Sequence, residues 1–223
     1  MNKFGNLPLK RMVDDEYHHS QKDPNKRVWN LSEVILGGQD GLVNVLGVIL
    51  GVAAATSDVR IVLVAGLAAT FAESISMGAV AYTSTLADAD FYESEREREY
   101  RHVQNVPNLE REEIRAIYQQ KGFQGELLEK IVDTITANED VWVAVMMAEE
   151  LKISPANRSS ALKSAIVVGI SAIFGSIIPL IPFTFLPITW GMIASVLLTA
   201  VVLFIVGAYK AHVTIGKPAR SGL

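Results

Sequence analysis

Apolar residues fill long stretches of this chain that carry almost no charge. Lys and Arg are absent from residues 28–59, 61–95 and 164–209, and the last of these stretches has no Asp or Glu either. A helix needs about 20 apolar residues to cross a bilayer, so the first two stretches hold one span each and the third holds two. Pro179, Pro182 and Pro187 are expected to mark the break between the last two spans. Four buried helices of a soluble protein are the alternative, but such helices normally carry polar faces.

The pattern therefore predicts an all-α fold: a polytopic membrane protein with four transmembrane helices and a helical insert between spans two and three. The predicted segments are an N-terminal tail at 1–30, spans at 31–56, 61–87, 159–180 and 187–209, the insert at 88–158, and a C-terminal tail at 210–223. Neither Pro nor Gly occurs between residues 79 and 106, so span two is expected to continue as one helix into the insert.

Basic residues are distributed unevenly around the spans. Six precede the first span, one lies between spans one and two, ten lie between residues 88 and 163, and three follow residue 209. By the positive-inside rule, this places both tails and the insert in the cytoplasm. Residues 88–163 also hold sixteen acidic side chains, which predicts a cation as the partner of the insert. The net charge of −4 indicates no nucleic-acid partner, and the absence of Cys excludes disulfides and thiolate ligands.

Short amphipathic helices are predicted within the insert. "NLEREEIRAIYQQKG" begins with Asn108 as a candidate N-cap and stops at Gly122. "QGELLEKIVDTITAN" carries apolar residues at helical spacing, namely Leu127, Leu128, Ile131 and Ile135. These patterns predict a small helical domain with its own apolar core.

One carboxylate lies inside the predicted first span. Asp40 shares a helix face with Asn44, and Gly37 and Gly41 flank it at the four-residue spacing that lets two helices approach closely. A packing face with a protonated Asp would explain this pattern. The alternative, a carboxylate that lines an ion path, is favoured because ionisable residues within a membrane usually serve a function.

The second span adds a carboxylate and a thioether one helical turn apart. Glu73 and Met77 offer a hard and a soft ligand, a combination that suits a borderline transition metal better than Mg²⁺ or Ca²⁺. Packing explains Met77 equally well. Together these two spans predict a translocation path formed by Asp40, Asn44, Glu73 and Met77.

The insert carries several metal-ligand types at helical spacing. Each pair alone matches an ordinary solvated helix face, and paired methionines are more often part of a core. Ligands from three helices are a stronger signal, because a bound cation needs donors from several directions. The predicted metal ligands are Glu99, His102, Glu110, Glu113, Met146, Met147 and Glu150. A metal role for His18 and His19 in the N-terminal tail is a further hypothesis.

No enzyme signature is found. Ser–His–Asp order, a P-loop and zinc-protease spacing are missing, so neither catalytic nor cofactor-binding residues are predicted. A di-iron centre of the ferritin type needs two E-x-x-H motifs on different helices, whereas this chain has one, Glu99 to His102.

Taken in order, these motifs have a known counterpart. "GGQDGLVN" in span one, "ESISMGAVAY" in span two, "WVAVMMAEEL" at the end of the insert and "GSIIPLIPF" in span three resemble the vacuolar iron transporter family over about residues 30–220. The resemblance implies a homodimer that exports Fe²⁺, and also Mn²⁺ or other divalent ions such as Co²⁺ and Zn²⁺, from the cytoplasm in exchange for protons. It also implies an ion path at the dimer seam and a metal-binding cytoplasmic module.

The resemblance assigns roles by position. Asp40 and Met77 match transport residues, and the ligands carried over to the module are Glu99, Glu110, Glu113, Met147 and Glu150, with Met146 beside them. His102 stands where glutamate is usual in the family, and Ala69 stands where a carboxylate is usual, with Glu73 one turn away. The family has five spans and this sequence predicts four, so either the natural chain is longer or this is a four-span form.

The predicted function is therefore a multi-pass transporter in a lipid bilayer, operating by metal/proton antiport and containing a cytoplasmic metal-capture domain. The membrane would be the plasma membrane in a prokaryote and a vacuolar or other organelle membrane in a eukaryote. A membrane-tethered metal sensor or store without transport is the alternative, motivated by the missing fifth span.

Overall fold

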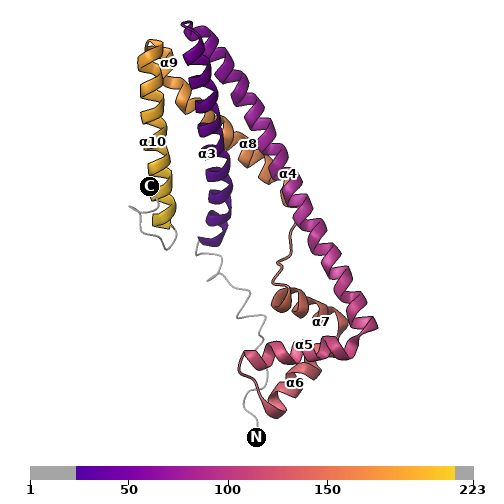
Figure 1. Ribbon diagram of the computed structural model, residues 1–223. Coiled ribbons are helices and arrows are strands. Elements are labelled where there is room, and N and C mark those ends of the chain that lie inside the picture. Colours follow the sequence, from indigo (N-terminus) through magenta and orange to yellow (C-terminus); the bar gives the residue numbers. More distant parts are fainter. Residues whose placement is uncertain (1–23, 214–223) are drawn as a thin grey trace, which may run out of the picture. The chain divides into compact units, whose positions relative to one another are not determined.

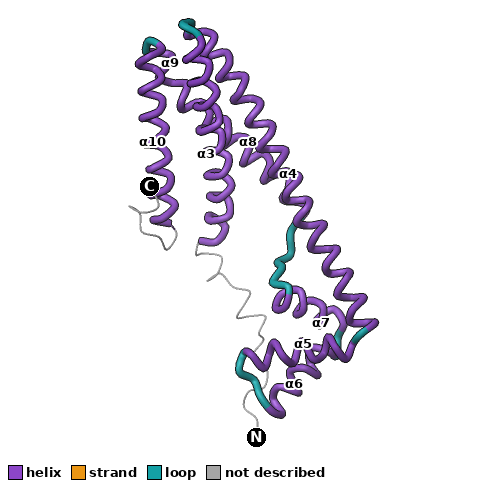
Figure 2. Tube along the Cα trace, in the orientation of Figure 1, coloured by secondary structure: helices purple, strands orange, loops and turns teal. Residues whose placement is uncertain are grey.

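The computed structural model describes the backbone of residues 24–213 and the side chains of residues 31–211. Every regular element in this part of the chain is a helix, and short loops join the helices (Figures 1 and 2). The chain divides into two compact units. Of the described residues, unit 1 contains 24–79 and 164–213, and unit 2 is Val80–Lys163.

Within residues 24–213, four helices are long and apolar enough to cross a membrane, which confirms the predicted fold class. Their candidate spans are Leu31–Ala55, Val59–Asn105, Arg158–Phe185 and Ile188–Ala211. They belong to α3 (Pro24–Ala55), α4 (Val59–Asn105), α8 (Ala161–Ile177) with its continuation, and α10 (Ile188–Val213). The second is a single helix of 47 residues, as the lack of Pro and Gly after Gly78 predicted.

The three prolines after α8 do not act alike, and the expectation that all of them mark a break is wrong. Pro179 lies in a 3₁₀ turn, η3 (Ile178–Leu180), and Pro182 lies in the first turn of α9 (Ile181–Phe185). Neither position requires an intrahelical N–H donor, so the chain stays helical there. The turn to α10 comes only at Leu186, which is extended (φ −119°, ψ 148°) because Pro187 follows it.

Helix α8 is the most buried span of unit 1, with more than half of its most apolar window buried compared with about a quarter in the other three. Glycines allow it to pack tightly against α3. A Cβ added at Gly175 would collide with the carbonyl oxygen of Gly38, and one at Gly37 would collide with that of Val168. The close approach predicted from Gly37 and Gly41 is thus directed at α8, with the backbones in contact.

The outer faces of the unit 1 helices are apolar. Phe71, Ile75, Phe174 and Phe185 are each more than 60% exposed within the chain. An apolar surface of this extent is unstable in water, and it suits helices whose sides meet lipid or a partner subunit. The buried hydroxyl of Thr70 donates to the carbonyl of Gly66 within its own helix, so it adds no exposed polarity.

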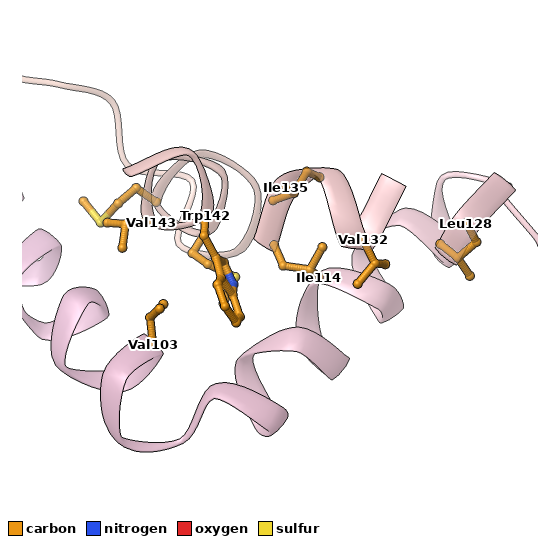
Figure 3. Packing of buried hydrophobic residues seen from close by; sticks show 9 residues of the cluster. Val103, Ile114, Leu128, Val132, Ile135, Trp142 and Val143 are labelled. Atoms are coloured by element: carbon orange, nitrogen blue, oxygen red, sulfur yellow. The ribbon is translucent and has the colours of Figure 1, made fainter. Parts of the chain in front are cut away.

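Unit 2 is a small helical domain built around one apolar core. It comprises the end of α4 with α5 (Pro107–Gln120), α6 (Gly125–Thr136), α7 (Glu139–Val145) and a π-helical turn, η1 (Met146–Glu150). Figure 3 shows side chains from all four α-helices converging, and the core residues labelled there are Val103, Ile114, Leu128, Val132, Ile135, Trp142 and Val143. Two of the residues predicted on the apolar face of α6, Leu128 and Ile135, are buried, and Ile131 packs against the core. Leu127 is exposed, so its predicted place on that face is wrong: the buried face follows Leu128, Val132 and Ile135.

Asn108 does not cap α5, contrary to the sequence expectation. The helix begins one residue earlier, at Pro107, and Val106 occupies the N-cap position. Proline at the first helical position needs no donor, so it replaces the side-chain cap. Asn138 does cap α7, because its side-chain oxygen accepts a hydrogen bond from the Val141 N–H at 3.1 Å.

Candidate metal-binding sites

A group of polar side chains joins two membrane helices within unit 1. The Asn44 side chain of α3 donates a hydrogen bond to Glu73 Oε1 of α4 at 3.0 Å. Glu73 also forms a hydrogen-bonding contact with the carboxyl group of Asp40. Three of the four residues predicted to form the translocation path therefore meet, although 29 residues separate Asn44 from Glu73 in sequence.

This group lies on an open side of the helix pair. Asn44 is exposed within the chain, and Asp40, Glu73 and Met77 are partly exposed. Gly47, on the same helix as Asn44, has no atom within 4 Å of the place where a Cβ would lie. Polar groups on an open face in a bilayer favour a water-filled path or a partner surface over contact with lipid.

The second candidate site is a cluster of acidic side chains and one histidine in unit 2. Its ligand atoms form two groups of three, Glu99–His102–Glu110 and Glu110–Glu113–Glu150, and within each group all atoms lie within 4.8 Å of one another. Glu110 belongs to both groups. His102 Nδ1 lies 3.4 Å from Glu110 Oε1 and 3.9 Å from Glu99 Oε1. Five of the seven predicted ligands therefore come together from α4, α5 and η1.

Burial of negative charge makes this cluster electrostatically unusual. Glu99 and Glu110 are only 2% and 3% exposed, and Glu110 Oε2 is buried with no hydrogen-bond partner among the described residues. Burial, together with the nearby charges of Glu113, Glu99 and Glu150, raises the pKa of Glu110 to about 7. Burial also raises the pKa of Glu150, with contributions from Glu113 and Glu99. A bound proton or metal ion would relieve this repulsion, so the arrangement suits an oxygen-preferring divalent ion.

The π-helical turn is the element that brings the last ligand into place. The Leu151 N–H donates to the Met146 carbonyl five residues earlier, at 3.2 Å, instead of to the carbonyl four residues earlier. A π turn adds a residue to one helical turn and shifts the side chains that follow, and such turns are frequent at functional sites. Glu150 joins the cluster, whereas its neighbour Glu149 forms an ion pair with Lys121 at 2.6 Å.

Met146 and Met147 belong to the apolar core of unit 2. They are 0% and 2% exposed and pack in the cluster of residues that includes Trp142 and Val143. Packing, the alternative given above for this pair, accounts for their burial. Their role as ligands stays a prediction, and so do the roles assigned to the carboxylates.

Other sequence-derived candidates lie outside these groups. His18 and His19 precede the described residues.

Arg98 was not recognised from the sequence, although its NH2 group lies 2.7 Å from Glu95 Oε2 and 3.5 Å from Glu99 Oε1. The alternation of acid and base in "ESEREREY" was the available signal, but the same pattern is ordinary on solvated helices.

Comparison with known proteins agrees with this architecture. A family model described as "VIT family" matches residues 31–223. The chain belongs to the VIT family. Membership confirms the resemblance to vacuolar iron transporters noted from the sequence.

Several VIT family relatives carry that name. A protein of Arabidopsis thaliana named Vacuolar iron transporter 1 is 34% identical over 190 residues, which are 85% of this chain and 76% of that protein. Vacuolar iron transporter 1 of Oryza sativa subsp. japonica is 32% identical over 98% of this chain and 88% of its own length. Vacuolar iron transporter of Plasmodium falciparum is 31% identical over 96% of this chain and 84% of its own length. With its four apolar helices, this VIT family chain is a multi-pass integral membrane protein.

Proposed function

We propose that this protein transports Fe²⁺, and also other divalent transition metals such as Mn²⁺, Co²⁺ and Zn²⁺, out of the cytoplasm in exchange for protons. The observation that carries the proposal is the contact of Asp40, Asn44 and Glu73 across two membrane helices. Carboxylate, amide and a nearby thioether form a donor set suited to borderline divalent metals. The names of the VIT family relatives support iron as the transported ion.

Exchange follows from competition for the same oxygen atoms. In a low-dielectric path an isolated ionised carboxyl group is unfavourable, and either a proton or a metal ion bound to the carboxyl groups of Asp40 and Glu73 removes that cost. A divalent ion binds the ionised forms, and its arrival therefore releases protons. The two fluxes are coupled without any covalent intermediate.

A homodimer completes the coordination of the ion. One chain offers side chains from Asp40, Glu73 and Met77, whereas an octahedral ion needs about six ligands. A two-fold partner doubles the set. The open face of α3 beside Asn44, where a Cβ on Gly47 would meet no atom within 4 Å, is suited to such a partner.

Unit 2 then serves as the capture domain on the cytoplasmic side. Nearly all Lys and Arg residues lie in the tails and in residues 88–163, with a single one between spans one and two, and this distribution supports that orientation. The paired three-residue groups that share Glu110 provide the ligands, and Glu110 Oε2 is buried without a hydrogen-bond partner among the described residues. Captured ions would pass from this cluster to the membrane group.

The test uses the full chain in liposomes with a pH-sensitive dye inside and Mn²⁺ or Fe²⁺ outside. Asp40→Asn is expected to abolish metal-driven proton movement and to leave metal binding to unit 2 unchanged. Asp58→Asn is the matched control, because Asp58 lies in the α3–α4 turn, outside the candidate spans, and caps the Arg60 N–H. Undiminished proton release by Asp40→Asn would rule out the proposed path.

A metal sensor or store without transport is the second candidate. The observation in its favour is that the ligand cluster is complete within unit 2, with both three-residue groups drawn from residues 99–150. Saturable binding of metal to the wild-type protein without flux into liposomes would support the sensor and contradict the transporter.

A further inference from the structure

One arginine lies against the acidic cluster of unit 2. The Arg98 guanidinium contacts Glu95 Oε2 at 2.7 Å and Glu99 Oε1 at 3.5 Å. Its Nε atom is buried and has no hydrogen-bond partner among the described residues. Glu99 is almost fully buried, so the positive charge of Arg98 lies beside a carboxylate that is shielded from solvent.

We infer that Arg98 is the built-in counter-ion of the empty cluster and that it weakens metal binding there, so that a captured ion can be released. This inference rests on the proposed role of unit 2 as a metal-capture domain. Arg98 is a positioning residue in this role, because it acts through Glu99 and does not itself bind the metal.

Electrostatics gives the direction and size of the effect. Transition-metal ions bind carboxylate oxygens at about 2.0–2.2 Å. An ion on Glu99 Oε1 therefore lies within about 6 Å of the Arg98 guanidinium. At that distance a +2 and a +1 charge repel enough, even in a water-like dielectric, to weaken binding about tenfold. The effect reaches a second ligand, since Arg98 opposes the burial and the like charges that raise the pKa of Glu150.

The same charge stabilises the domain while no metal is bound. Glu95 and Glu99 lie on one face of α4 at i, i+4, where like charges repel, and Arg98 lies between them. Loss of Arg98 should therefore destabilise the empty domain and leave the metal-bound domain much less affected. An arginine with a purely structural role would stabilise both states equally.

The experiment compares the full-length protein in detergent with R98Q, R98M, R98K and R96Q, with Mn²⁺ as the probe and free Mn²⁺ measured by electron paramagnetic resonance. R96Q is the matched control. Arg96 also pairs with a glutamate three residues earlier, Glu93 at 3.4 Å, but it stacks on Tyr100 and does not touch the cluster. R98Q and R98M are expected to bind Mn²⁺ about tenfold more tightly. R98K, which keeps the charge, and R96Q should stay within about twofold of wild type.

Thermal unfolding provides the second readout. The increase in Tm on saturation with Mn²⁺ should be larger in R98Q and R98M than in wild type, and unchanged in R96Q. If wild type binds Mn²⁺ and neither R98Q nor R98M binds it more tightly, the inference about Arg98 is wrong, whereas the proposed capture function of unit 2 is not contradicted. If wild type and E110Q bind Mn²⁺ identically, so that no binding occurs at unit 2, both the proposed capture function and the inference about Arg98 are wrong.

Discussion

The pH dependence of metal binding by unit 2 should reveal the unusual state of Glu110. This side chain is shared by both three-residue groups and is 3% exposed, and its pKa is raised from 4.5 to about 7 by burial and by the charges of Glu113, Glu99 and Glu150. A metal must displace the Glu110 proton before it can use that oxygen. Binding should therefore weaken as the pH falls below about 7, and not only near 4.5.

The magnitude follows from a single competing proton. With a pKa of about 7, the apparent dissociation constant rises about tenfold between pH 8 and pH 6, whereas with the ordinary value it would change by only about 3%. The measurement is Mn²⁺ binding to the full-length protein in detergent at pH 8, 7 and 6. An H102Q background removes proton competition at the imidazole. Glu110→Gln should bind more weakly at every pH and lose most of the slope.

Without metal, the contribution of Glu110 to folding stability should change with pH in the opposite direction to that of most acidic residues. The folded-state pKa of Glu110 lies above its unfolded value, so its contribution to stability is complete below pH 4.5 and is lost as the pH rises towards about 7. The loss is at most about 3–4 kcal/mol, since the pKa is raised from 4.5 to about 7 and one pKa unit corresponds to about 1.4 kcal/mol. Metal-free E110Q should consequently have a higher Tm than wild type at pH 8.

Two results would refute this reasoning. One is a Mn²⁺ affinity that is constant from pH 8 to 6 and falls only near pH 4.5. The other is an equal pH slope in H102Q and in H102Q/E110Q. Either outcome would mean that Glu110 is ionised in the empty cluster, and the electrostatic description of the site would have to be abandoned.

Further predictions concern packing and metal preference. Gly175→Ala should lower stability in detergent by about 2 kcal/mol, because a Cβ there collides with the α3 backbone, whereas Gly38→Ala, where a Cβ would lie 3.7 Å from the nearest atom, the Ser171 carbonyl oxygen, should be neutral or stabilising; equal Tm values would contradict the tight α3–α8 contact. Ile114→Ala should destabilise unit 2 by about 2–5 kcal/mol, and Leu109→Ala, 57% exposed on the same helix, by less than about 0.5 kcal/mol, as measured by denaturant unfolding. His102→Glu should lower the affinity for Zn²⁺ relative to Mn²⁺ about tenfold in competition binding, because imidazole favours zinc and carboxylate favours manganese; an unchanged ratio would place His102 outside the metal-binding site.

Much of the candidate chemistry was visible in the sequence because helical spacing alone creates it. Glu99 and His102, or Glu110 and Glu113, share a helix face wherever the helix lies. Sequence spacing could not show that the two pairs meet, because a contact between α4 and α5 depends on the turn at Val106 and on core packing around Ile114.

Two features of the site depended on details that sequence patterns do not resolve. The π turn at Met146–Glu150 selects Glu150 for the cluster, while Lys121 holds Glu149 in an ion pair. The sequence offers two adjacent glutamates with no basis for choosing between them. Arg98 was missed because a basic residue in an acidic helix is usually solvated, and only its distance to the buried Glu99 distinguishes it.

The sequence by itself determined the all-helical character, the four apolar helices found among the described residues, the continuity of α4 and most of the apolar core of unit 2. These features depend on local hydrophobicity, on the thickness of a bilayer and on the absence of helix breakers, all of which are properties of short segments. Tertiary structure alone decided which carboxylates are buried, which of them share Glu110, and that Asp40 and Asn44 meet Glu73 across two helices. The physical reason is that burial and contact depend on atoms brought together from distant segments, and no local pattern specifies those distances.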